Sequence, residues 1–114
     1  MNAEPLLKKQ RTKKLSKEFH LCMDVTADIA SACGINREEI TRKNRHATVV
    51  GARHLAMYIL NNLGVGRRYI CQFFNRDRTS IYHSLDNAQN LLDTDVDVQE
   101  HTKLMLKEYE QRRI

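Results

Sequence analysis

The sequence predicts an all-α protein, a compact bundle of about six helices. Its 114 residues include one proline and four glycines, which are too few for the many turns that a sheet requires. Apolar residues also recur at spacings of three and four along most of the chain, the period of one helix face. An apolar content of 41% is enough for one small core, so we expect a single domain.

The N-terminal part of the chain predicts a tail followed by a helix. Residues 1–14 are polar and basic without a clear period, and we expect a flexible basic tail there. The domain is expected over residues 15–114. Its first helix is predicted from Ser16, as the N-cap, to Cys33, with Gly34 as the stop. The apolar stripe of this helix comprises Phe19, Cys22, Met23, Thr26, Ile29, Ala30 and Cys33.

Two further helices are predicted around a basic loop. Asn36 and Glu39 have the spacing of a capping box, which predicts a short helix over residues 37–42. The loop Arg42–His46 is too polar to pack. Thr48 is then expected to cap a helix over residues 49–63, which Gly64 ends. Its core face comprises Ala52, Leu55, Ala56, Ile59, Leu60 and Leu63.

A short helix and a longer helix follow, joined by a tight turn. The first is predicted over residues 67–74, and Asn75 after it tolerates the left-handed conformation. Asp77 is expected to cap the second helix, over residues 78–92. A turn of about three to four residues between two such helices is typical of a helix-turn-helix. The inward residues are Ile70, Phe73, Phe74, Ile81, Leu85, Ala88 and Leu92.

The last helix is predicted over residues 98–111, with Asp97 and Glu100 as a capping pair. Its inward residues are Val98, His101, Met105 and Tyr109. Three cysteines without a CxxC pair are expected to be free apolar residues in a reducing compartment. With no apolar stretch for a membrane span or signal peptide, we expect a cytoplasmic, nucleoid-associated protein with no membrane contact.

The charge is concentrated in the middle of the chain. Residues 42–78 contain eight basic residues and one acidic residue, whereas residues 79–114 contain four basic and seven acidic residues. A basic segment of this density indicates a polyanionic partner, with nucleic acid as the first candidate. A solvated basic face without a partner is the alternative.

The first turn of the helix after Asp77 carries residue types that can contact DNA bases. Arg78 can donate two hydrogen bonds to guanine, Thr79 can contact thymine, and Asp77 can accept from cytosine. The same residues with Ser80 could also form only a capping cluster, and one aspartate can do both.

Two other groups of cations could contact phosphate or the minor groove. Arg67 and Arg68 begin a helix, where positive charge opposes the helix dipole unless an anion lies in front of it. The loop residues Arg42, Lys43 and Arg45 could form a flexible arm that reaches into a minor groove. A solvated loop is equally compatible with that sequence.

The segments Ala52–Leu60 (ARHLAMYIL) and Ile70–Ser84 (ICQFFNRDRTSIYHS) resemble the C-terminal DNA-binding domain of the bacterial replication initiator DnaA, its domain IV. The resemblance covers residues 24–110. It implies a six-helix, Trp-repressor-like helix-turn-helix that binds double-stranded DNA and needs no cofactor. By position it implies major-groove contacts from Asp77, Arg78, Thr79 and Ser80, and a minor-groove contact from Arg45. It implies backbone or neighbouring-base contacts from Lys43, Arg53, His54, Gly66, Arg67 and Arg68.

The sequence departs from that family at four places. Arg78 stands where the family has histidine, Cys71 replaces a glycine, and Asn75 alone replaces a Gly-Gly turn. The basic residue late in the second helix is missing at positions 86–88. We therefore expect the fold to be kept and the preferred DNA sequence to differ. The 114 residues contain no GxxxxGK[ST] phosphate loop, so we expect a DNA-reading domain without the ATPase and without bound nucleotide.

We therefore predict a sequence-specific, double-stranded DNA-binding protein that regulates transcription or replication. A homodimer or a regulatory protein is a further expected partner. No catalytic role is expected, because the five histidines and three cysteines show neither a zinc-binding spacing nor a recognisable triad. The alternative is a protein-interaction module that docks a replication or transcription regulator without binding DNA. The salt dependence of DNA binding distinguishes the two.

Overall fold

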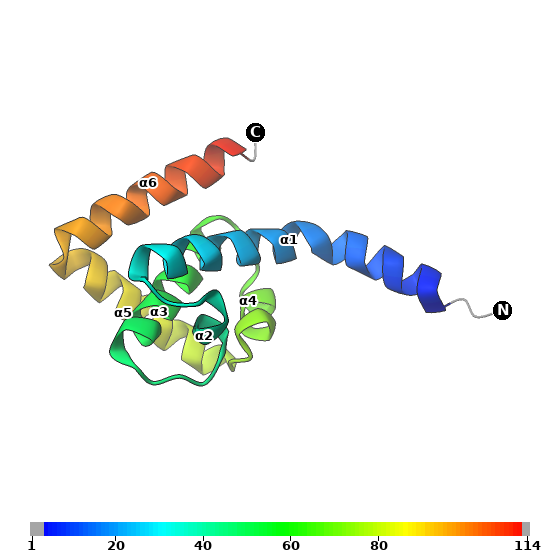
Figure 1. Ribbon diagram of the computed structural model, residues 1–114, viewed down its shortest axis with the longest axis horizontal. Coiled ribbons are helices and arrows are strands. Elements are labelled where there is room, and N and C mark those ends of the chain that lie inside the picture. Colours follow the sequence, from blue (N-terminus) through cyan, green and yellow to red (C-terminus); the bar gives the residue numbers. More distant parts are fainter. Residues whose placement is uncertain (1–3, 113–114) are drawn as a thin grey trace.

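The computed structural model describes the backbone of residues 4–112 and the side chains of residues 17–112. Within that range it has six helices and no strand (Figure 1). The helices are α1 (Glu4–Cys33), α2 (Arg37–Thr41), α3 (Ala47–Asn62), α4 (Arg67–Phe74), α5 (Arg78–Thr94) and α6 (Val96–Arg112). The predicted all-α class and the number of helices are confirmed.

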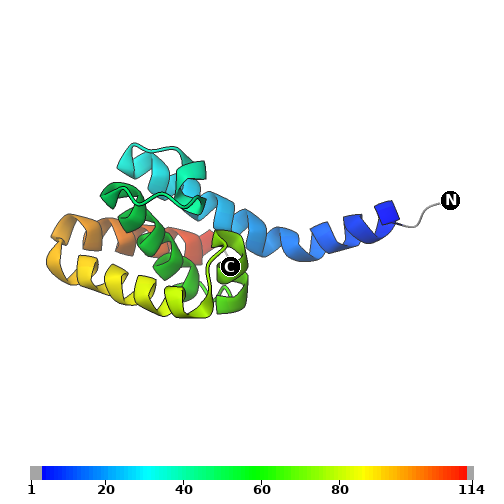
Figure 2. The same ribbon diagram turned by 90° about the horizontal axis from the view of Figure 1, so that it is seen from below.

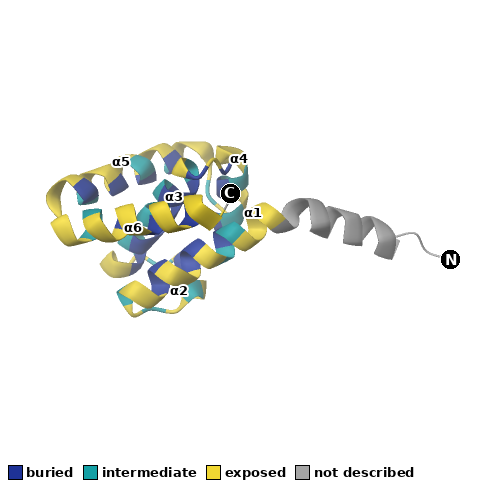
Figure 3. Cartoon of the chain, turned by 90° about the horizontal axis from the view of Figure 1, so that it is seen from above, coloured by how far each residue is buried: buried dark blue, intermediate teal, exposed yellow. Residues whose placement is uncertain are grey.

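Helix α3 lies at the centre of the bundle and packs against each of the other five helices. Its inner face is fully apolar apart from one arginine, Arg53. Helices α5 and α6 lie side by side as a hairpin (Figure 2). Buried positions follow the inner faces of α1, α3, α5 and α6 (Figure 3), so one continuous core positions the surface loops.

Helix α1 begins earlier than the sequence indicated. The expected start at Ser16 is wrong, because the helix runs from Glu4. The residues before Ser16 are mostly lysine, arginine, glutamine and leucine, which favour helix, and Pro5 lies in the first turn, where proline is tolerated. Residues 1–3 of the predicted tail lie outside the described residues. The division between a tail and a domain at residue 14 stays a prediction.

The apolar stripe of α1 is mostly confirmed. Cys22, Thr26, Ile29 and Ala30 are buried, with Val25 beside them. Phe19 was expected on the apolar stripe but is 44% exposed, and its ring forms a T-shaped pair with Phe73 of α4, with centroids 6.1 Å apart. The three cysteines are free, as predicted, although Cys33 and Cys71 are only half-buried. Burial, with a smaller contribution from the charge of Glu18, raises the pKa of the Cys22 thiol to about 12.

Three predicted caps are wrong. The side chain of Asn36 makes no capping hydrogen bond at α2, and α3 begins at Ala47, before the expected cap Thr48. The turn into α3 is instead formed by Asn44, whose side-chain oxygen accepts from the His46 amide at 2.8 Å. Helix α6 begins at Val96, because Asp95 rather than Asp97 accepts from the first amides of that helix.

The C-terminal helix contributes to the core as expected at two positions. Met105 and Tyr109 are buried, whereas His101 is exposed, contrary to the prediction. The Tyr109 hydroxyl donates a hydrogen bond to the Asp28 carboxylate, which ties α6 to α1. At the other end of α6, Asp93, Asp95 and Asp97 make the junction with α5 acidic. Among the described helices, none is long and apolar enough to cross a membrane.

Candidate nucleic-acid interface

The turn between α4 and α5 has the geometry that its sequence predicts. Asn75 ends α4 in the left-handed conformation, with φ 52° and ψ 53°. The amides of Asn75 and Arg76 donate to the carbonyls of Gln72 (3.3 Å) and Cys71 (2.9 Å), which closes the C-terminus of α4. This pattern fixes the direction in which the chain enters α5.

The first turn of α5 is exposed and capped. The Asp77 carboxylate accepts from the Ser80 amide at 2.7 Å, so the predicted cap is confirmed. Hydrogen bonds from Ser80 hold the pKa of the Asp77 carboxyl below its usual value. Arg78 and Thr79 are exposed and Ser80 is half-buried, while Ile81 faces the core. The chain therefore presents Arg78 and Thr79 outward from a rigid helix end.

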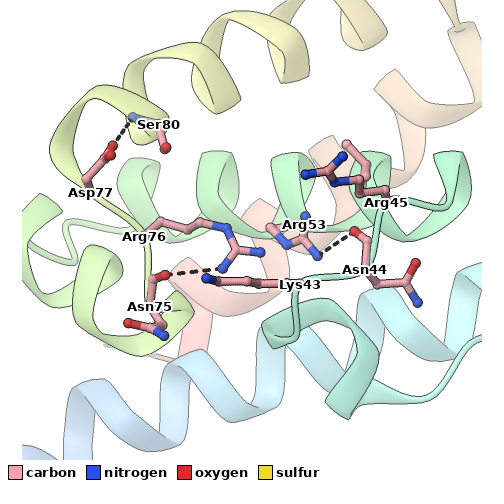
Figure 4. Close-up of a pocket in the computed structure, with 9 residues that line it drawn as sticks. Lys43, Asn44, Arg45, Arg53, Asn75, Arg76, Asp77 and Ser80 are labelled. Carbon is pink, nitrogen blue, oxygen red and sulfur yellow. Dashed lines mark hydrogen bonds between the residues drawn. The ribbon is translucent and has the colours of Figure 1, made fainter.

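The loop between α2 and α3 lies close to this helix end. A depression of about 480 Å³ separates them (Figure 4). It is lined by Lys43, Asn44, Arg45, Val50, Arg53, Asn75, Arg76, Asp77 and Ser80. Two segments more than thirty residues apart in sequence thus form the two walls of one basic cavity.

Arg53 lines the same cavity, and main-chain carbonyls hold its guanidinium group. It is only 6% exposed, and its Nε atom donates to the Ile40 carbonyl at 2.7 Å. Its Nη2 atom donates to the carbonyls of Arg42 at 2.7 Å and Asn44 at 3.2 Å. These bonds hold the basic loop from the side of α3, and the expected DNA contact of Arg53 stays a prediction.

A second depression, of about 250 Å³, lies on the other side of the same helix end, between α4 and α5. It is lined by Arg67, Arg68, Cys71, Gln72, Arg78, Ile81 and Tyr82. Arg67 and Arg68 are exposed. The structure therefore places cations on both sides of the first turn of α5, three of them at this second depression.

Two expected site residues lie outside both depressions. Gly66 is the N-cap of α4, with open space where a side chain would begin. His54 is half-buried on α3, and burial followed by the charge of Arg53 lowers its pKa. The expected DNA contacts of Gly66 and His54 stay predictions.

Two residues that line the depressions were not among the site residues expected from the sequence. Arg76 donates to the carbonyls of Phe74, Asn75 and Arg42, and its signal was a lone basic residue inside the turn. Tyr82 is 48% exposed, and its signal was an aromatic residue four positions after Arg78, on the same side of α5.

In the described part of the chain, no acidic side chain forms an ion pair with the cations that line the two depressions. We call these cations the cation surface: Lys43, Arg45, Arg53, Arg67, Arg68, Arg76 and Arg78. The two ion pairs found among residues 17–112 join Arg37 to Glu38 and Arg112 to Glu108, both away from the depressions. Asp77, the one carboxylate that lines either depression, is bound to the end of α5. The side chains described also contain no cluster that could hold a metal ion.

The matches to known proteins agree with the resemblance to DnaA. Residues 22–87 match the family described as the bacterial dnaA protein helix-turn-helix. The matched segment includes the basic loop, α3, α4 and the first half of α5.

Relatives named chromosomal replication initiator protein DnaA match between 56% and 74% of the chain. The protein of Rickettsia bellii (strain OSU 85-389) is 24% identical over 90 residues, which cover 74% of this chain and 19% of the relative. That of Rickettsia canadensis (strain McKiel) has the same identity and coverage. The protein of Thermotoga petrophila is 32% identical over 65 residues, covering 56% of this chain and 15% of the relative. The matched region spans about a fifth of the length of these curated relatives or less.

Proposed function

This chain belongs to the bacterial DnaA helix-turn-helix family, a non-catalytic domain, and from that premise we propose that it binds double-stranded DNA in a sequence-specific manner. The observation that carries the proposal is the unpaired cation surface around the exposed first turn of α5. The like charges of such a surface repel one another in the free protein, and a bound polyanion reduces this repulsion.

The basic loop and the first turn of α5 suit the two grooves of a duplex. Neighbouring grooves are separated by one sugar-phosphate strand, so a protein that enters both has to hold that strand between its two elements. We assign that strand to the cavity between the basic loop and α5, which Lys43 lines. We assign Arg45, exposed on the loop, to the minor groove, where arginine favours narrow A·T-rich segments.

Base reading is assigned to the first turn of α5. Arg78 and Thr79 are exposed there, and Arg78 can donate two hydrogen bonds to one guanine. Arg67 and Arg68, at the N-terminus of α4, are assigned to phosphate contacts, together with Lys43 of the loop. These contacts position the domain and carry little sequence information.

The proposed biological role is regulation of replication or transcription at the nucleoid. The relatives are named as chromosomal replication initiators, which favours replication control as the first case. A single reading helix binds weakly, so a second copy or a regulatory protein on the same DNA is a proposed partner.

The experiment is a selection of bound duplexes from a random library, followed by binding measurements over a range of salt concentrations. About three phosphate contacts predict a slope of roughly −3 in a plot of log K against log salt concentration. Arg67→Ala should weaken binding to every duplex and reduce that slope by about 1. Lys103→Ala, on α6 away from both depressions, is the control. A protein that shifts no duplex even at low salt would refute the proposal.

A further inference from the structure

The basic loop is held by two arginines that donate to one carbonyl group. The Arg42 carbonyl accepts from Nη2 of Arg53 at 2.7 Å and from Nη2 of Arg76 at 3.1 Å. Arg53 belongs to α3, whereas Arg76 belongs to the turn before α5. This shared acceptor is the point at which the loop, the central helix and the helix-turn-helix are joined.

Further hydrogen bonds hold the rest of the loop. Arg53 also bonds the Asn44 carbonyl, and the side chain of Asn44 accepts from the His46 amide. Each of these acceptors lies outside a helix and would otherwise face water. The basic loop, which was expected to be a flexible arm, is therefore held by hydrogen bonds to the carbonyls of Arg42 and Asn44. Lys43 and Arg45 stay exposed.

Holding one carbonyl with two arginines has an electrostatic cost. Arg53 and Arg76 carry like charges and share an acceptor, and neither has a carboxylate partner in residues 17–112. Burial, and then the charge of Arg76, lowers the pKa of Arg53. A neutral hydrogen-bond donor could tie the loop without this repulsion. The two charges also raise the positive potential of the cavity beside them, which favours an anion there without a contact from either guanidinium group.

We propose that Arg53 and Arg76 are positioning residues, which lock the basic loop to the turn before α5 so that Arg45 and the reading helix meet DNA as one rigid unit. The proposal rests on the function proposed above and adds a constraint to it. The separation between the base pairs read by Arg45 and those read by α5 is set by the protein. A loop that is already ordered also loses less conformational entropy on binding.

The test on DNA is a double-mutant cycle. Arg76→Lys keeps the charge but loses the planar fork that reaches three carbonyls. The probes are a duplex selected by the wild-type protein and versions of it with A·T pairs replaced by G·C pairs at the loop end. Arg76→Lys should reduce this discrimination about three- to tenfold, and should have no further effect in an Arg45→Ala background. Arg112→Lys, a matched change on α6, should leave it unchanged.

A second measurement tests the lock in the protein without DNA. Amide hydrogen exchange of residues 42–46, and of the His46 amide above all, should be faster in Arg53→Lys and Arg76→Lys than in the wild type. If Arg53→Lys unfolds the domain, the half-exposed Arg76 position still carries the test. Thermal unfolding and circular dichroism report whether each variant is folded.

The outcomes separate this proposal from the proposed function. If Arg76→Lys weakens all probes equally and adds to the effect of Arg45→Ala, Arg76 is a direct phosphate contact and the proposal is overturned. Unchanged exchange in the loop overturns it as well. If the wild-type protein binds no duplex, the function proposed above fails, whereas the exchange measurement still decides whether the lock exists.

Discussion

The guanidinium group of Arg67 lies over the ring of Tyr82, 5.1 Å from its centroid. The Nη1 atom of Arg67 also donates a hydrogen bond to the Tyr82 hydroxyl at 3.2 Å. These contacts join the first turn of α4 to the second turn of α5 at the protein surface. They hold an exposed cation in one place next to Arg78, in the depression between the two helices.

We predict that Tyr82→Ala weakens binding to all duplexes by about two- to fivefold, because Arg67 loses the stacking that fixes it at an exposed site. Tyr82→Phe keeps the ring and should retain most of the affinity. Fluorescence anisotropy with one labelled duplex measures both variants. Equal losses in the two variants would mean that the hydroxyl, and not the ring, holds Arg67.

Arg78→Ala should relax the base preference at one position of the target and cost about 1–3 kcal/mol of discrimination there. The reason is the loss of two directed hydrogen bonds to a base, with the phosphate contacts left in place. Sequence selection from random duplexes checks this result. Arg78→His restores the residue type of the resembling family and should change the preferred base rather than abolish preference. An unchanged selected sequence for both variants would rule out Arg78 as a base-reading residue.

Asp77→Ala should lower the midpoint of thermal unfolding by a few degrees, since α5 loses its capping acceptor. Asp77→Asn keeps an acceptor and should be milder. The folded pKa of Asp77 is lowered, so its contribution is fully present above the unfolded pKa and is lost as pH falls through the folded value. Thermal unfolding of wild type and Asp77→Asn between neutral and acidic pH should therefore show a smaller loss in the variant.

Asn75→Val should destabilise the protein by about 1–2 kcal/mol, because a β-branched residue is strained at φ 52°. Asn75→Gly should be close to neutral, since glycine adopts this conformation without strain. Urea unfolding measures the free energy of unfolding of both variants. Equal stability of the two variants would show that the turn can relax into another conformation.

The helix-turn-helix could be predicted from sequence because its signals are local. The bounds of α4, the left-handed Asn75 and the Asp77 cap each depend on residues within one turn of each other. The starts of α3 and α6 were displaced because their cap signals were ambiguous, whereas α1 begins earlier because the residues before Ser16 favour helix. At α6, for example, Asp95 and Asp97 are both suitable caps, and the sequence does not choose between them.

The role of Arg53 was not accessible from local rules. It bonds carbonyl groups of α2 and of the following loop, and such contacts depend on how the helices pack. A weak signal did exist, because Arg53 lies four residues after Val49 and four before Met57, inside the buried stripe of α3. A charge at such a position requires buried acceptors.

Helix α5 runs from the cation surface at Arg78 to the acidic junction at Asp93 and Asp95, a length of about 25 Å. Helix α5 consequently has a positive end and a negative end. Near a duplex, these ends experience opposite forces, and the resulting torque turns the molecule before any atom touches DNA. Encounters then begin in a productive orientation, and the association rate, more than the dissociation rate, should depend on ionic strength.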